Sequence, residues 1–185
     1  MPLILIKESG DLQFECATQI FIYTQQGDRL FAIVASALEQ LNFSIQDARI
    51  YNSGYGFSLD TFFVLDSNGQ PIGDDSERIN EIQSVLREHL VNMDSSLDII
   101  QRRTPRQMRL FSVPTRTTLF TDVARGHSVL EVLTPDRPGL LARIGKIFLD
   151  YGIKLQNAKI ATLGEKVEDV FFITDKNQHP IDDPD

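Results

Sequence analysis

The strings FSLDTFFVLD at residues 57–66 and KVEDVFFITD at residues 166–175 follow one pattern. In both, an aspartate stands two positions before a pair of phenylalanines and six positions before a second aspartate. The likeness extends outward to Ala17–Ile72 and His127–Ile181, which align at a shift of 110 and, after a one-residue deletion, of 109. The chain therefore holds two copies of one unit, and the elements of that unit decide the fold.

Each copy predicts the same order of elements: strand, helix, strand, strand. Alternation of apolar residues predicts the strands, and apolar residues three or four apart predict the helices. Asp28 is placed to cap the first helix, and Asp74 with Glu77 resembles a capping box for a further helix in the first copy. The expected strands are Ile20–Tyr23, Ile45–Tyr51, Phe57–Asp66, Val129–Leu133, Lys154–Ala161 and Val167–Thr174, and the expected helices lie at Leu30–Leu41, Ser76–Leu90 and Leu141–Tyr151.

One more element is expected in Met108–Asp122, either two short strand pieces or an edge strand, because Pro114 interrupts the run. The order predicts an α+β fold of tandem ferredoxin-like βαββαβ units, each an antiparallel sheet with helices on one face. We expect a lead-in from a preceding domain at 1–16, in which Met1–Ile6 is a strand, and a first domain at 17–122. The second domain, 127–185, is expected to be incomplete at its C-terminus, with the copies side by side or face to face.

Composition narrows the functional classes. The formal net charge of −8 disfavours a general binder of nucleic acid or of anionic membranes. One cysteine, Cys16, excludes an intrachain disulfide and fits a cytoplasmic protein, and no apolar run approaches the roughly 18 residues of a membrane span. Five arginines lie in the basic loop 101–118: Arg102, Arg103, Arg106, Arg109 and Arg116. They form either a solvated linker or a dock for an acidic surface.

Catalytic motifs are absent from the sequence. His89, His127 and His179 are isolated, without the spacing of metal ligands. There is no phosphate-binding Gly-Lys-Ser/Thr loop and no nucleophile elbow. We therefore expect no catalytic residue and no metal site in this chain, and a binding role instead.

The turn before the helix of the second copy is the main candidate site. A proline fits the first helical turn, a glycine lets a ligand approach the backbone, and the free N–H groups there suit a carboxylate. An ordinary capped helix start explains the same residues. The candidates are Asp136, Arg137, Pro138, Gly139, Leu140 and Leu141, with Gln26, Gly27 and Asp28 at the matching place in the first copy.

A second candidate lies on the strand after that helix. Asn157 in the second copy and Asp47 in the first occupy the same place in the repeat. An amide or carboxylate there suits the amino group of a ligand. A polar residue on the open face of a strand explains the position equally well.

The motif Asp136–Ala142, followed by Gln156-Asn157-Ala158 and Phe171-Phe172-Ile173, resembles the ACT domain, a small amino-acid-sensing module. The longer string Leu155–Asp175 resembles the C-terminal region of the bifunctional uridylyltransferase/uridylyl-removing enzymes, as do Leu59–Asp66 and Arg102–Gln107. The resemblance covers nearly the whole chain. It implies that a tandem ACT pair senses glutamine and switches a parent enzyme between two activities on the nitrogen-signalling protein PII.

The same resemblance implies that catalysis and any divalent metal belong to the parent's other domains, so no cofactor is expected in this chain. The partners implied are glutamine, those catalytic domains and PII as the parent's substrate, with a homodimer possible; nucleic acid and membranes are not implied. Two alternatives remain. One is a stand-alone two-ACT regulator of the glycine-cleavage repressor type, and the other is a dimerisation module without a ligand.

Overall fold

The fold was analysed in a computed structural model that describes residues 1–9, 16–53, 55–92, 114–135, 137, 139–163 and 166–181. The first part of the chain forms four strands and two helices. They are β1 (Leu3–Glu8), β2 (Thr18–Gln25), α1 (Leu30–Gln40), β3 (Ser44–Asn52), β4 (Phe57–Leu65) and α2 (Ser76–Val91). Every element expected in this part is present. The cap of α2 is Asp75, one residue after the expected Asp74, because its carboxylate accepts the N–H groups of Glu77 and Arg78.

The second part repeats most of this order. Its elements are β5 (Arg116–Asp122), β6 (His127–Pro135), α3 (Leu140–Asp150), β7 (Lys154–Leu163) and β8 (Lys166–Thr174). The likeness of the copies extends to their loops. Asp66 accepts the backbone N–H groups of Asn68 and Gln70, and Asp175 accepts those of Asn177 and His179. Within the described residues, no helix corresponding to α2 follows β8.

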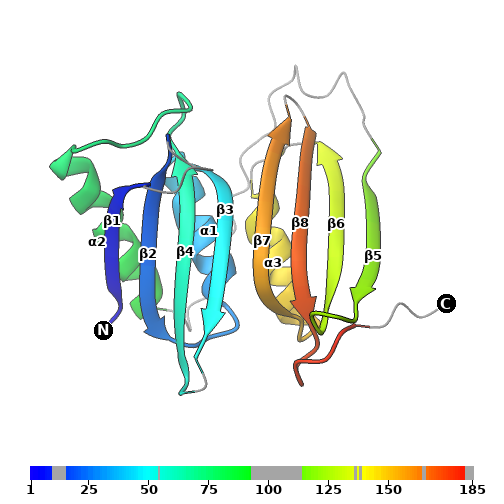
Figure 1. Ribbon diagram of the computed structural model, residues 1–185. Helices are drawn as coiled ribbons and strands as arrows, with labels where there is room; N and C mark the ends of the chain where they lie inside the picture. The colour runs from blue at the N-terminus through cyan, green and yellow to red at the C-terminus, as the bar shows by residue number, and fades with distance from the viewer. Residues whose placement is uncertain are drawn as a thin grey trace.

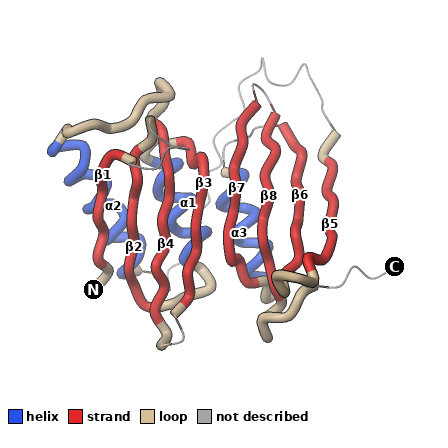
Figure 2. The backbone as a smooth tube through the Cα atoms, viewed as in Figure 1, coloured by secondary structure: helices blue, strands red, loops and turns tan. Residues whose placement is uncertain are grey.

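All eight strands form one antiparallel sheet in the order β1-β2-β4-β3-β7-β8-β6-β5. The two copies lie side by side, and Figure 1 shows the junction between β3 and β7 at the middle of the sheet. Helices α1, α2 and α3 lie on one face of the sheet (Figure 2, helices in blue and strands in red). The α+β, ferredoxin-like prediction is confirmed.

The two edge strands correct part of the expected organisation. β5 pairs with β6, the first strand of the second copy, and not with β2 of the first copy. The place beside β2 is taken by β1, whose buried Ile4 packs in the core. Residues 3–8 are thus an integral edge strand, and residues 116–122 complete the second half of the sheet. Most of the basic loop 101–118 lies outside the described residues. The exact domain boundaries stay a prediction.

The junction has an approximate two-fold axis. Ala48 lies directly opposite Ala158, its counterpart in the repeat, and both are fully buried. On the helical side, α1 and α3 pack against each other. A Cβ added at Gly145 of α3 would lie 2.9 Å from Ala32 Cβ and 3.0 Å from Phe31 Cδ1. The small residues let the copies approach closely, so the turns that precede α1 and α3 lie near the opposite copy.

Candidate ligand site

Two equivalent turns flank the junction, one between β2 and α1 and the other between β6 and α3. Helix α1 begins at Leu30 and its N-cap, Arg29, makes no side-chain capping bond. Helix α3 begins at Leu140 after Gly139, which has φ of 77° and makes no side-chain capping bond either. Only glycine adopts that backbone angle without strain. Two helix N-termini without side-chain caps therefore lie at the junction, where backbone N–H groups favour negative charge.

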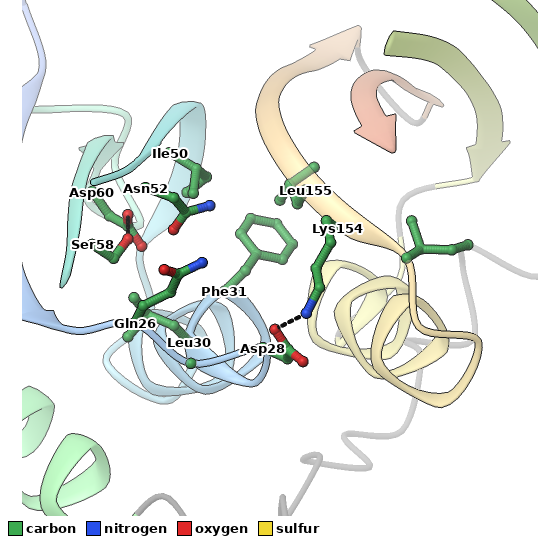
Figure 3. A pocket seen from close by; sticks show the side chains of 12 residues that line it. Gln26, Asp28, Leu30, Phe31, Ile50, Asn52, Ser58, Asp60, Lys154 and Leu155 are labelled. Carbon is green, nitrogen blue, oxygen red and sulfur yellow. Dashed lines mark hydrogen bonds and ion pairs between the residues drawn. The ribbon is translucent and has the colours of Figure 1, made fainter. Parts of the chain in front are cut away.

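The first turn borders a cleft between the two copies. The cleft contains about 410 Å³ of space between atoms, part of which is open to solvent. Figure 3 shows it between α1 and the start of β7. It is lined by Gln26, Gly27, Asp28, Leu30, Phe31, Ile50, Asn52, Ser58, Asp60, Ile153, Lys154 and Leu155. The cleft therefore unites the β2–α1 turn of one copy with β7 of the other.

One wall of the cleft carries an ion pair that joins the copies. Lys154 Nζ on β7 donates to Asp28 Oδ1 on the turn (Figure 3). The sequence predicted that Asp28 caps α1. In the structure it does not, because its carboxylate is engaged by the lysine. Beside the pair, the ring of Phe31 stacks on Phe62, with their centroids 6.4 Å apart. The wall thus combines an apolar surface with one charge of each sign.

The opposite wall is polar and contains a buried carboxyl group. Asp60 on β4 is 1% exposed, and Ser58 Oγ–H donates to its Oδ1. Its Oδ2 is buried and has no hydrogen-bond partner among the described residues. Burial raises the pKa of Asp60 to about 7, although the Ser58 hydroxyl and the Tyr51 backbone partly oppose the shift. Asn52 and Gln26 stand beside it (Figure 3).

The second turn differs because the chain itself supplies a carboxylate there. Glu39 near the end of α1 accepts the backbone N–H of Gly139 through Oε1. The repeat places Leu149 of α3 at the position equivalent to Glu39, and leucine has no acceptor group. The N-terminus of α3 therefore holds an internal carboxylate, whereas the corresponding region of the first copy opens into the cleft.

The other expected residues of the second turn are placed as follows. Arg137 is exposed, and Leu140 and Leu141 pack partly buried against the core. Asp136 and Pro138 lie outside the described residues. A ligand carboxylate at Gly139 remains a prediction, and in the structure it would have to displace Glu39.

Asp47 and Asn157 are not brought together with either turn. Each precedes a core alanine, Ala48 or Ala158, that faces the helices, so their own side chains lie on the helix-free face of the sheet. There Asp47 forms a salt bridge with Arg49, with 2.9 Å between Oδ2 and Nε. Asn157 Oδ1 is buried without a hydrogen-bond partner among the described residues. These two residues therefore belong to the face opposite the cleft.

A comparison with known protein families finds a match in the second half of the chain. The ACT domain family matches residues 128–183. The match begins within β6 and runs beyond β8, so it contains α3 and the turn before it.

The whole chain also resembles longer proteins. It is 55% identical over 183 residues, 99% of the chain, to a bifunctional uridylyltransferase/uridylyl-removing enzyme of Pseudomonas savastanoi. It is 52% identical over 183 residues to the enzyme of Stutzerimonas stutzeri and 55% identical over 184 residues to that of Pseudomonas aeruginosa. The chain spans about 20% of the length of these relatives. The resemblance predicted from the sequence is confirmed.

Among solved structures, the chain is similar to an unknown protein from Galdieria sulphuraria. The TM-score is 0.33 at 16% identity, over 85% of this chain and 80% of that one.

The remaining chemistry of the described residues is sparse. No group of three or more His, Cys, Asp or Glu side chains among them is arranged to hold a metal ion. No helix in the described part of the chain is long and apolar enough to cross a membrane. His89 contacts Gln40 Oε1 at 3.2 Å, and the ring of His127 packs edge-on against Phe172. The first contact is a hydrogen bond and the second is aromatic packing.

Sequence reasoning missed the polar wall of the cleft. Ser58, Asp60 and Asn52 line the cleft, and none of them is among the candidates predicted from the sequence. A signal existed for Asp60, because both copies carry an aspartate at the same place inside an apolar strand. A charged residue at a position where the strand faces the core is unusual, and it indicates a polar role.

Proposed function

We propose that this chain is an amino-acid-sensing regulatory module, and that glutamine is the effector. The observation that carries the proposal is the cleft between the copies, which contains charges of both signs, an apolar surface and a polar wall. A free amino acid has complementary parts: an ammonium, a carboxylate and a side chain. The ACT family match, and relatives named as enzymes with two opposed activities, support a regulatory role.

The module is proposed to act within a uridylyltransferase/uridylyl-removing enzyme whose substrate is PII. The names of the relatives indicate transfer and removal of uridylyl groups. The isolated chain is proposed to have neither activity. Any divalent metal would belong to the catalytic domains, and the parent is expected in the cytoplasm. A ligand bound in the cleft would contact both copies at once. It would therefore favour one arrangement of the pair over another, which is the requirement for coupling to a distant site.

The β2–α1 turn and the start of β7 are the elements that such a ligand would bridge. They are already linked by the ion pair of Asp28 and Lys154. A zwitterion would offer its carboxylate to the lysine and its ammonium to the aspartate. The pair would then be exchanged for two ligand contacts without leaving a charge unpaired, which keeps the electrostatic cost of binding low.

Isothermal titration of the purified chain tests the proposal. Glutamine is the first ligand, with alanine, serine and glutamate for comparison. We expect saturable heat with glutamine and a stoichiometry of one site in the cleft per chain. Lys154→Ala is expected to weaken binding. Lys146→Ala, which removes an exposed ion pair within α3 and changes no residue of the cleft lining, serves as the control. The proposal would be refuted if none of these amino acids bound saturably.

A contact between copies of the chain is a second candidate role. The helix-free face exposes large apolar side chains at its outer edge: Leu3 is 50% and Leu5 51% exposed, and Tyr23 stacks on Phe57 at 5.3 Å between ring centroids. Such a cluster is typical of a protein interface. Sedimentation equilibrium tests it: a dimer abolished by Leu5→Lys supports the role, and a monomer at all concentrations contradicts it.

A further inference from the structure

The polar wall of the cleft contains an acceptor that lacks a donor. Asp60 Oδ1 receives the Ser58 hydroxyl, whereas Oδ2 is buried without a hydrogen-bond partner among the described residues. Buried polar atoms in native proteins are almost always paired, because an unpaired one loses its hydration without compensation. Because Asp60 also lines the cleft, a ligand bound there can supply the missing donor.

The opposite wall fixes the orientation of that ligand. Lys154 and Asp28 are the other ionisable groups that line the cleft, and they lie across Phe31 from Asp60 (Figure 3). The charged main-chain groups of an amino acid match this pair, so its side chain extends past the phenyl ring toward Asp60, Ser58 and Asn52. What reaches the polar wall is the end of the ligand's side chain.

The chemistry of that wall discriminates between side chains. A carboxamide has an NH2 group that donates to the unpaired oxygen of Asp60. The side-chain NH2 of Asn52 can in turn donate to the carbonyl oxygen of the ligand's carboxamide. A carboxylate brings no donor and places like charge against Asp60 when that group is ionised. An ester of the same length is neutral but also has no donor. Sites that hydrogen-bond a buried substrate group reject analogues that lack it far more effectively than apolar pockets do.

We propose that Asp60 determines ligand specificity, selecting an amino acid with a side-chain carboxamide over one with a side-chain carboxylate or ester. This inference rests on the proposed amino-acid-sensing function of the cleft. Asp60 acts by accepting a hydrogen bond from the ligand amide, with Ser58 holding the other carboxyl oxygen in place. The second copy differs at this place, because Val167 stands where the first copy has the serine.

The test compares three ligands on one chain by isothermal titration: glutamine, glutamate and the γ-methyl ester of glutamate. In the unaltered chain, we expect glutamine to bind at least about tenfold more tightly than the ester, because loss of a hydrogen bond to a charged or buried partner is worth about that factor. This comparison requires no variant, so a folding defect cannot obscure it. Equal affinities for glutamine and the ester would overturn the inference.

Two variants then assign the discrimination to its residue. Asp60→Asn is expected to reduce the ratio of glutamate to glutamine dissociation constants about tenfold or more, because asparagine is neutral and can donate to a carboxylate. Asp169→Asn, the same change at the equivalent position outside the cleft, is the matched control and should leave the ratio unaltered. A ratio unchanged in Asp60→Asn would overturn the inference while leaving the proposed function intact. Absence of binding by all three ligands in the unaltered chain would overturn both.

Discussion

Replacing Asp60 with asparagine is expected to change how the free energy of unfolding depends on pH. Burial raises the pKa of Asp60 from 3.8 to about 7. An aspartate with a higher pKa in the folded chain retains its proton there while the unfolded chain has lost it. Stability therefore falls as pH rises through the interval between the two values, and the loss is complete above the folded pKa.

The magnitude follows from the size of the shift. About three pKa units at about 1.4 kcal/mol each amount to about 4 kcal/mol in total, of which about 3 kcal/mol develops between roughly pH 5 and pH 8. Asparagine cannot ionise, so this part of the pH dependence disappears in Asp60→Asn. The stability of the variant relative to the unaltered chain should accordingly rise by about 3 kcal/mol over that range.

Urea denaturation followed by circular dichroism, at several pH values with a common slope, measures this difference. Asp66→Asn is the control with the opposite sign. Hydrogen bonds from the backbone N–H of Gln70 and neighbouring donors lower the pKa of Asp66. Its contribution to stability is lost only as pH falls below the ordinary range of aspartate, so its difference should be flat above pH 5. A flat difference for Asp60→Asn over the same range would refute the reasoning.

Three further changes test, by urea denaturation, the contacts between the two copies and one link within the second copy. Gly145→Ala should destabilise the chain by about 1–3 kcal/mol through overpacking against Ala32, although an alanine in an open helix would stabilise it by about 1 kcal/mol; a gain would contradict the close approach of α1 and α3. Glu39→Ala should lower the free energy of unfolding by about 1–2 kcal/mol, because the Gly139 N–H loses its carboxylate acceptor. An unchanged free energy would show that this contact does not stabilise the chain. Ser128→Ala should cost about 1–3 kcal/mol, because its buried hydroxyl exchanges two hydrogen bonds of 2.8 Å with the backbone of residue 181; unchanged stability would contradict that link.

The sequence predicted the elements and their order because the repeat and the apolar periodicity are local properties. Whether β5 pairs with β2 or with β6 is not local. It depends on which sheet edge is free, and β1 fills the edge beside β2 through its apolar Ile4. The sequence indicates a strand at Met1–Ile6, but the alternation of residues within a strand does not specify which strand it pairs with.

The candidate site was predicted in part. The β2–α1 turn at Gln26–Asp28 does border the cleft, because equivalent turns must lie near a junction with two-fold symmetry. The partners of Asp28 and Gly139 were not predictable from local sequence. Lys154 and Glu39 come from the opposite copy, 126 and 100 residues away. Such contacts depend on how the copies pack.

The central claim is that a free amino acid binds between the two copies. An NMR titration of the isotope-labelled chain with glutamine tests it most directly, because each backbone amide reports its own surroundings. We expect saturable chemical-shift changes of backbone amides around the cleft, all with one dissociation constant. They should occur at Gly27–Leu30, Asn52, Ser58–Asp60 and Ile153–Leu155. Chemical-shift changes confined to the helix-free face, or no changes at a large excess of glutamine, would contradict binding between the two copies.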